Sequence, residues 1–261
     1  LHKVKYLLLS VLYPYKPASI LSSFIFEKLF FLADSITVSN SFLKARFGGE
    51  IIWHARDENN YNPKNYKNSV VRKKYGVTIS DKIVLFMGTI RPHKGIETLI
   101  NSISEIPNST ISLLLVGIDD SLYNKEIVLL GRRKLLKRFY SFNIQPFFKV
   151  PEFLSMADVI VIPQKKNMSS MGQMPAKIFD AMAMEKAIIS TSVSDIPEVL
   201  KGCGIIIDAE SQQEMSDAIK SLFEDVEKRE FLGEKARNKF IKNYSYSAMR
   251  EVLKTIINNI K

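Results

Sequence analysis

The sequence predicts an α/β fold in which a parallel, doubly wound sheet carries helices on both faces, with a smaller N-terminal remnant before it. Two observations support this. Several segments, such as Ile83–Met87 and Ile111–Val116, are nearly continuous apolar runs, which suits strands that are buried on both faces. From about residue 69 onward, strand and helix signals alternate along the chain, and this alternation is typical of a parallel sheet with crossover helices.

The individual elements of this sheet follow from apolar periodicity and from Gly and Pro punctuation. We expect strands at 82–88, 111–117, 143–147, 158–162, 187–191 and 204–207. We expect helices at 95–105, 123–140, 151–156, 176–184, 196–201, 211–224, 227–242 and 246–260.

The N-terminal part shows a different organisation. Pro17 suits the first turn of a helix that runs to about Leu32. Short strands are expected at 35–39 and 50–54, and between them Asn40 is a candidate cap for a helix that ends at Gly48-Gly49. Residues 55–68 are polar and are interpreted as a linker. The predicted boundary divides the chain into 1–68 and 69–261.

The composition limits the function less than the fold. The 261 residues carry a net charge of +10, which favours anionic partners such as phosphorylated substrates, anionic lipid surfaces or nucleic acid without choosing among them. Cys203 is the only cysteine, so an intrachain disulfide is excluded, which is compatible with a reducing cytoplasm. There is no uninterrupted apolar run of 18 residues, so a membrane-spanning helix is not expected.

The first candidate site is the loop that follows the strand at 82–88. It contains Gly88, Thr89, Arg91 and Lys94 and leads through Gly95 into a helix. In open α/β sheets, ligands lie outside the carboxyl ends of such strands. Backbone N–H groups and two basic side chains at this place suit a phosphate.

A matching feature follows the strand at 158–162. A polar loop with Gly172, Gln173 and Met174 leads to Pro175, where a helix is expected to begin. Lys177 and Asp180 are three residues apart and share one face of that helix. The carboxylate can accept hydrogen bonds from paired ribose hydroxyls, and the lysine can meet a phosphate or reach solvent. Together the two loops indicate a nucleotide-sugar site.

Five short motifs in this order resemble a known family. The chain is similar to the C-terminal, donor-binding domain of a group 1 (GT4-type) retaining glycosyltransferase with the GT-B fold, whose domains are Rossmann-like. The resemblance covers about residues 70–260 and extends back through 33–39 and 54–57. The motifs are Gly88-Thr-Ile-Arg-Pro-His-Lys-Gly95, Leu115-Val-Gly117, Met156-Ala-Asp-Val-Ile-Val-Ile-Pro163, Pro175-Ala-Lys-Ile-Phe-Asp-Ala-Met-Ala183 and Ser194-Asp-Ile-Pro-Glu198.

The resemblance implies a role for each matched residue. Lys94 and Arg91 would neutralise the donor diphosphate and stabilise the leaving nucleotide diphosphate, which makes them the candidate catalytic residues. Asp180 matches the second acid of the family's Glu-x7-Glu pattern, which holds the ribose. The loop at 172–174 would lie along the donor sugar, and Gly88 and Thr89 would face the phosphates. The resemblance implies neither a metal nor a cofactor.

Two positions depart from the family pattern. The first acid of the Glu-x7-Glu pattern falls at Gly172, so a side-chain contact to the sugar hydroxyls is missing or comes from elsewhere. The arginine that usually follows the first glycine is Thr89 here, and Arg91 comes two residues later. Asp180 has one methylene fewer than the usual glutamate.

The resemblance also raises a question of length. Members of this family have two domains of similar size with the active site between them, whereas only residues 1–54 precede the linker here. We therefore expect an N-terminally truncated or fragmentary enzyme that binds nucleotide but transfers sugar poorly on its own.

The expected function is transfer of a sugar from a nucleotide diphosphate sugar to a glycan or lipid-linked acceptor, with retention of configuration, in cell-surface polysaccharide or glycolipid synthesis. The expected location is the cytoplasm, with peripheral contact at the inner face of the membrane as an option. The basic run at 132–138 is either a solvated helix face or a contact for anionic lipid.

Two alternatives remain open. The first is a non-catalytic nucleotide-binding or interaction module of Rossmann type. The second is a nucleic-acid-binding protein, which only the net charge suggests. Because the basic residues are dispersed and no recognition motif occurs, nucleic acid is not among the expected partners.

Overall fold

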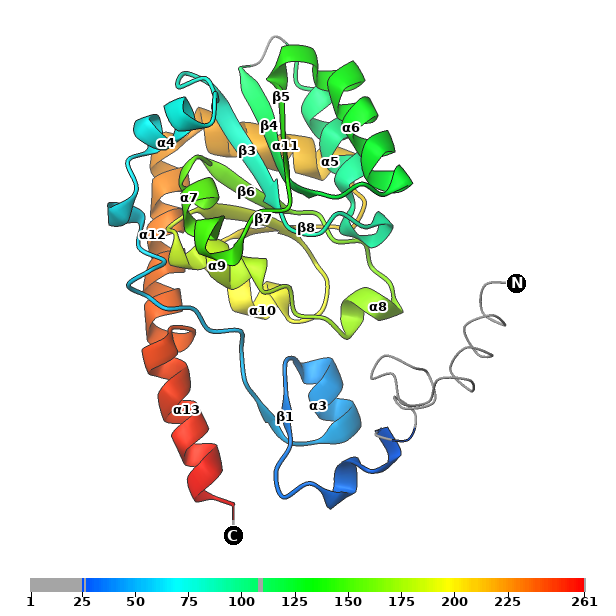
Figure 1. The fold of residues 1–261 in the computed structure, drawn as a ribbon, viewed down its shortest axis with the longest axis vertical. Coiled ribbons are helices and arrows are strands. Elements are labelled where there is room, and N and C mark those ends of the chain that lie inside the picture. The colour runs from blue at the N-terminus through cyan, green and yellow to red at the C-terminus, as the bar shows by residue number, and fades with distance from the viewer. Residues whose placement is uncertain (1–24, 26, 108–109, 261) are drawn as a thin grey trace, which may run out of the picture.

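The computed structural model describes residues 25, 27–107 and 110–260. Its centre is a six-stranded sheet in which all neighbouring strands are parallel, in the order β5-β4-β3-β6-β7-β8 (Figure 1). The predicted doubly wound α/β fold is therefore confirmed. The strands are β3 (Lys82–Met87), β4 (Ile111–Ile118), β5 (Phe139–Asn143), β6 (Val159–Ile162), β7 (Ala187–Thr191) and β8 (Ile205–Ile207).

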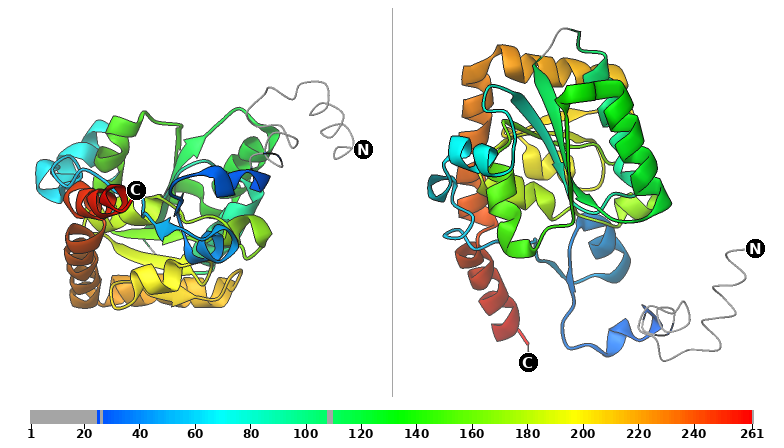
Figure 2. Two further views of the ribbon diagram at one scale, coloured as in Figure 1. Left: turned by 90° about the horizontal axis from the view of Figure 1, so that it is seen from below. Right: turned by 45° about the horizontal axis from the view of Figure 1, so that its top comes forward.

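Helices cover both faces of this sheet (Figures 1 and 2). One face is packed by α5 (Ile96–Ser104), α6 (Leu122–Leu135) and α11 (Gln212–Glu224). The other face is packed by α4 (Asn68–Lys74), α7 (Val150–Ser155), α9 (Lys177–Ala183), α10 (Ile196–Leu200) and α12 (Val226–Asn243).

Alternate side chains of each strand point into these two layers. In β3, Val84 and Phe86 belong to the core under α5 and α11, whereas Ile83 and Leu85 belong to the core under α7 and α9. All four side chains are at most 1% exposed. Burial on both faces explains why the central strands are continuous apolar runs rather than alternating ones.

One strand was placed wrongly by the sequence analysis. The predicted helix at 123–140 ends at Leu135, and the strand expected at 143–147 lies instead at 139–143 as β5. Leu136 takes a positive φ of 53°, so the helix is broken by a residue type that gives no sequence signal for it. The remaining predicted ends in this sheet region differ from the observed ones by at most two residues, and α4 and α8 (Met168–Met171) were not predicted.

The N-terminal part forms a small unit of its own. It contains the 3-10 turn η1 (Phe30–Leu32), β1 (Thr37–Val38), α3 (Ser41–Phe47) and β2 (Glu50–Ile51), with β1 and β2 parallel. The predicted cap is confirmed, because the Asn40 side chain accepts a hydrogen bond from the Leu43 N–H at 2.8 Å. Both strands are shorter than expected, and most of the helix predicted from Pro17 lies outside the described residues.

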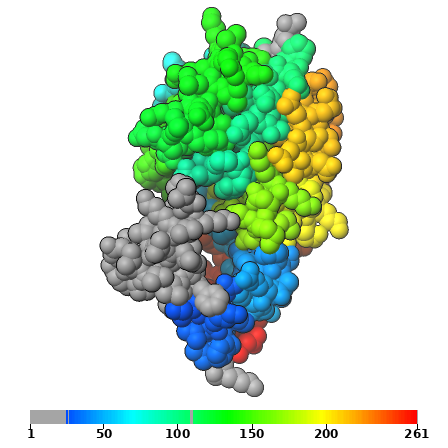
Figure 3. Space-filling model, turned by 90° about the vertical axis from the view of Figure 1, so that its right-hand side faces the viewer, coloured from blue at the N-terminus to red at the C-terminus, as the bar shows by residue number. Residues whose placement is uncertain are grey.

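Two regions join this N-terminal unit to the sheet domain. The Asn40 amide donates to the carbonyl oxygen of Met171 at 3.2 Å, and the Ser41 N–H donates to Asp195 at 2.7 Å. Figure 3 shows the unit, in blue, directly below the yellow-green segment around α8. On another side, α13 (Tyr246–Asn258) runs back past the linker, and a bridge pairs Arg56 with Ser245 (Figure 1). The domain boundary within 55–68 stays a prediction.

Candidate functional site

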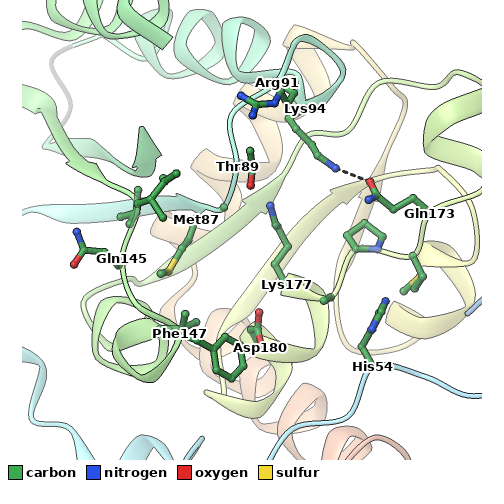
Figure 4. A pocket seen from close by; sticks show the side chains of 18 of the residues that line it. His54, Met87, Thr89, Arg91, Lys94, Gln145, Phe147, Gln173, Lys177 and Asp180 are labelled. Atoms are coloured by element: carbon green, nitrogen blue, oxygen red, sulfur yellow. Dashed lines mark hydrogen bonds between the residues drawn. The ribbon is translucent and has the colours of Figure 1, made fainter. Parts of the chain in front are cut away.

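A pocket of about 820 Å³ lies at the carboxyl edge of the parallel sheet (Figure 4). Its walls come from the end of β4, the loops after β3, β5 and β6, the start of α9 and the N-terminal segment. All nine residues that the sequence analysis selected line it: Gly88, Thr89, Arg91, Lys94, Gly172, Gln173, Met174, Lys177 and Asp180.

Two glycines allow the loop after β3 to lie close to the end of β4 and to Lys177. Gly88 has a φ of +136°, and a Cβ there would come within 2.0 Å of the Lys177 Nζ. Gly117 has a φ of +117°, and a Cβ there would lie 2.3 Å from the carbonyl oxygen of Gly88. A side chain at either position would be strained; at Gly88 it would fill the space beside Lys177, and at Gly117 it would press on the backbone of Gly88.

Lys94 reaches into this pocket from the short 3-10 turn η3 (Pro92–Lys94). It is only 9% exposed, and its Nζ donates to Gln173 Oε1 at 2.8 Å and to Gln164 Oε1 at 3.4 Å. Among the described residues, no carboxylate lies within 4 Å of this ammonium group. Burial lowers its pKa. A buried cation with only neutral partners is costly unless an anion binds beside it.

Lys177 presents a second such cation from the first turn of α9. Its Nζ lies 4.7 Å from the centre of the Phe86 ring, and it makes no hydrogen bond or ion pair with the part of the chain that the structure describes. Burial, followed by the charge of Lys94, lowers its pKa to about 8. Figure 4 shows the two lysine side chains pointing into the same space.

Lys186 is a partly buried lysine of the same fold whose ammonium group finds its hydrogen-bond partners within the protein. Its pKa is also lowered to about 8, mainly by burial. Its Nζ, however, donates to the carbonyl oxygens of Ala157 at 2.7 Å and Ser155 at 3.3 Å. Lys177 differs in that it lines the pocket and has no such partner among the described residues.

Asp180 lies one turn further along α9, on the same side as Lys177 (Figure 4). Its side chain is buried and forms an ion pair with Arg56 through Oδ1 and the guanidinium Nε. Burial raises the pKa of this carboxyl, whereas the charges of Arg56 and Lys177 act in the opposite direction. Oδ2 has no hydrogen-bond donor among the described residues, so this oxygen remains available for a ligand.

Arg91 lines the pocket but is already paired. Its Nη1 donates to Asp119 at 2.9 Å, and its side chain is 46% exposed. Hydrogen bonds from Ser121, together with Arg91, lower the pKa of Asp119 to about 2. Arg91 is therefore a half-exposed cation at the rim of the pocket that already has a carboxylate partner, whereas Lys94 and Lys177 form no ion pair with a described residue.

The loop before α9 supplies the opposite wall. Gln173 is exposed and accepts from Lys94, whereas Met174 is 2% exposed and belongs to the core. Gly172 has no side chain to offer, and a Cβ there would lie near the ring of Phe42. The structure thus brings the predicted loop to the site but places no carboxylate at position 172.

Several lining residues were missed by the sequence analysis. The loop after β5 contributes Ile144, Gln145 and Phe147, which had been assigned to a strand. His54, at the end of the strand expected at 50–54, also lines the pocket, and burial followed by the charge of Arg56 lowers its pKa. The polar segment at 55–68 gave no sign that Arg56 would pair with Asp180.

The described part of the chain contains neither a cluster of metal ligands nor a membrane-spanning helix. Across residues 25, 27–107 and 110–260, no group of three or more His, Cys, Asp or Glu side chains is arranged to hold a metal ion. Over the same residues, none of the helices has both the length and the apolar character needed to cross a membrane.

Comparison with known proteins agrees with this geometry. The chain is 25% identical over 198 residues to an alpha-D-kanosaminyltransferase of Streptomyces kanamyceticus, covering 74% of this chain and 50% of that protein. It is 23% identical over 200 residues to a D-inositol 3-phosphate glycosyltransferase of Corynebacterium glutamicum, covering 72% and 46%. The chain spans about half the length of these relatives.

Solved structures show the same fold. Sucrose-phosphate synthase from Thermosynechococcus elongatus superposes with a TM-score of 0.76 at 19% identity, over 90% of this chain and 60% of that one. HepE from Anabaena, solved with UDP and glucose, superposes with a TM-score of 0.74 at 16% identity, over 89% and 67%. These neighbours are GT-B glycosyltransferases.

A family model described as glycosyl transferases group 1 matches residues 68–239, which is well over half of the chain. The predicted resemblance is thereby confirmed, and the chain belongs to the group 1 glycosyltransferases.

Proposed function

We propose that this chain binds a nucleotide diphosphate sugar and takes part in transfer of the sugar to a glycan or lipid-linked acceptor with retention of configuration. The observation that carries the proposal is that one pocket holds the buried Lys94, the partly buried Lys177 and the buried carboxylate of Asp180, and that neither lysine forms an ion pair with a described residue. Family membership and the UDP complex of HepE favour the same ligand class.

The charges suggest how the donor would lie. The diphosphate fits between Lys94 and Lys177, because each ammonium lacks an anionic partner and a diphosphate supplies charge for both. Asp180 is suited to accept hydrogen bonds from the ribose hydroxyls. The base would then point toward Phe147, which lies beside Asp180, and toward Gln145, on the far side of Met87 from Lys177 in Figure 4.

The catalytic contribution of the chain is electrostatic. As the bond between the anomeric carbon and the diphosphate breaks, negative charge grows on the leaving phosphate, and the two lysines stabilise it. Arg91 adds a cation at the rim when it turns from Asp119. Asp180 is the only carboxylate among the described residues that line the pocket, and Arg56 engages it. A donor phosphate oxygen is therefore the proposed base that takes the acceptor proton.

The acceptor side is proposed to lie near the membrane. Leu122 and Leu129 lie seven residues apart on α6 and are 74% and 64% exposed, and Leu136, directly after the end of α6, is 74% exposed. Arg132 and Arg133, both exposed, flank this line. Such a face suits peripheral contact with anionic lipid at the inner leaflet, where glycolipid or surface-polysaccharide precursors would be met. Co-sedimentation with phosphatidylglycerol vesicles, lost in Leu129→Ser/Arg132→Ser, would test this contact.

Nucleotide titration tests the donor site. UDP, GDP, ADP and CDP are titrated calorimetrically into the chain, and the tightest is repeated with Lys94→Met, Lys177→Met and Asp180→Asn. Each lost charge-assisted contact should weaken binding by about 10- to 100-fold. Lys254→Met, which removes a 60% exposed cation on α13, is the matched control. Unchanged affinity in all three variants would refute the site.

Turnover separates an enzyme from a binding module. Release of nucleotide diphosphate from the corresponding nucleotide sugar is followed with and without an acceptor extract. Transfer that is lost in Lys94→Met supports the catalytic role, whereas tight binding without any transfer favours the non-catalytic alternative.

A further inference from the structure

Arg56 is the residue through which the linker reaches the pocket. Its guanidinium Nε pairs with Asp180, its Nη1 donates to the carbonyl oxygen of Ala55 at 2.8 Å, and its side chain is 13% exposed. The guanidinium also lies 5.3 Å from the centre of the Phe147 ring and 5.9 Å from that of Tyr61. These contacts hold a planar, always charged group in one orientation.

The backbone that carries this side chain is fixed as well. The Arg56 carbonyl oxygen accepts from the Tyr246 N–H at 2.9 Å, and the Arg56 N–H donates to the carbonyl oxygen of Tyr244 at 3.4 Å. Glu58, two residues on, accepts from the Tyr246 N–H at 3.2 Å and from the Ser247 hydroxyl. The linker is therefore joined to the turn between α12 and α13, and the Arg56 side chain reaches Asp180 from a fixed point.

We propose that Arg56 is a positioning residue that fixes the Asp180 carboxylate for the ribose hydroxyls of the donor nucleotide. The ion pair occupies Oδ1 and leaves Oδ2 without a donor among the described residues. A ribose offers two adjacent hydroxyls, and a carboxylate that is ionised and held at one oxygen can accept both. This inference rests on the proposed function, because it specifies how that site selects a ribonucleotide.

The need for Arg56 follows from the burial of the carboxylate. Burial alone favours the neutral acid, and it raises the pKa of Asp180. The charged or titratable groups that face this carboxyl are Arg56 and the phenol of Tyr61 from the linker, His54 directly before the linker, and Lys177 from α9. Without Arg56, only Lys177 and His54 would oppose the cost of burial, and the carboxyl would protonate closer to neutral pH and lose its preferred orientation.

The test compares ribose with dideoxyribose on the same base. The ligand is whichever of UDP, GDP, ADP and CDP binds the unmodified chain most tightly, together with its 2′,3′-dideoxy counterpart. We expect the unmodified chain to prefer the ribo form by about tenfold or more. In Arg56→Met this preference should fall to about threefold or less at pH 6, while affinity for the dideoxy form changes by less than about twofold.

Three further measurements distinguish positioning from general support of the fold. The ribose preference of Arg56→Met should recover as the pH rises toward 9, because the Asp180 carboxyl then ionises, and Arg56→Lys should keep part of it at pH 6. The double variant Arg56→Met/Asp180→Asn should lose no more than Asp180→Asn alone. Arg250→Met, which replaces an exposed arginine on α13, should match the unmodified chain.

The outcomes separate the two proposals. If the unmodified chain binds none of the four diphosphates, the proposed function fails and this inference fails with it. If it binds with a ribose preference that Arg56→Met retains, or if Arg56→Met weakens both forms equally, the positioning role is overturned while the donor site stands.

Discussion

Lys177→Met should make the unliganded protein more stable and its nucleotide binding weaker. The Lys177 ammonium has no hydrogen bond or ion pair with a described residue, and its pKa falls from 10.5 to about 8. A lysine shifted by this much destabilises the folded state near neutral pH by about 3 kcal/mol. Methionine keeps a long apolar stem against Phe86 and carries no charge to desolvate.

The net gain is smaller than this penalty. The variant loses the contact between the ammonium and the Phe86 ring, worth about 0.5–2 kcal/mol, whereas the attraction to Asp180 is already contained in the lowered pKa. We expect a net stabilisation of about 1–2 kcal/mol at pH 7, which corresponds to a rise in Tm of about 2–6 °C for a chain of this size. Ligand binding should fall by about 10- to 100-fold because a charge-assisted phosphate contact is lost.

Thermal denaturation at pH 7 and pH 9.5 checks the sign. The folded-state pKa of Lys177 lies below its unfolded value, so the unmodified chain is destabilised below pH 8 and recovers stability as the pH rises from about 8 toward 10.5. The advantage of Lys177→Met should therefore shrink by about 2 kcal/mol between pH 7 and pH 9.5. A variant that is less stable at pH 7, or an advantage that does not change with pH, would refute the reasoning.

Lys186→Met is the matched control for this experiment. Lys186 has a similarly lowered pKa, but its replacement leaves the carbonyl oxygens of Ala157 and Ser155 without their donor. Each buried group left unsatisfied costs about 1–3 kcal/mol. We therefore expect no gain in Tm for Lys186→Met and no change in nucleotide affinity.

Three further predictions concern particular side chains. Tyr61→Phe removes a buried hydroxyl that has no hydrogen-bond partner among the described residues. The free energy of unfolding should therefore stay within about 0.5 kcal/mol of that of the unmodified chain, or rise. A loss above about 1 kcal/mol in denaturant titration would contradict this. Gly88→Ala places a Cβ within 2.0 Å of the Lys177 Nζ, whereas Gly76→Ala meets nothing within 4 Å; calorimetry should show weaker nucleotide binding in the first variant and unchanged binding in the second. Asn40→Ala removes both the α3 cap and the hydrogen bond to Met171 and should lower the free energy of unfolding by about 1–3 kcal/mol. Equal Tm values for this variant and the unmodified chain would show that these contacts do not stabilise the protein.

The parts of the fold that could be predicted are those that local sequence determines. The central strands β3, β4, β6 and β7 are buried on both faces, so each appears as an apolar run between polar loops. The edge strand β5 is only half-buried and reads Phe-Tyr-Ser-Phe-Asn, and no Gly or Pro separates it from α6. Its apolar side chains therefore continued the helical pattern, and the strand was placed four residues too late.

That local error hid part of the site. Ile144, Gln145 and Phe147 follow β5 at the carboxyl edge, where ligands gather in parallel sheets. When they were assigned to a strand, they could not be recognised as a loop that lines the pocket. The nine residues that were predicted to line the site could be identified because each lies after a correctly placed strand or in the first turns of the next helix.

The remaining contact could not be predicted because it joins distant parts of the chain. Arg56 and Asp180 are separated by 124 positions, and nothing in the local sequence of either residue indicates the other. The same holds for two partly buried lysines, Lys177 on α9 and Lys186 after it, whose pKa values are both lowered to about 8. Only the structure shows that backbone carbonyl groups accept from Lys186, whereas Lys177 faces the pocket. Sequence therefore identifies which residues can bind an anion, whereas the tertiary partners of each charge decide which of them is free to do so.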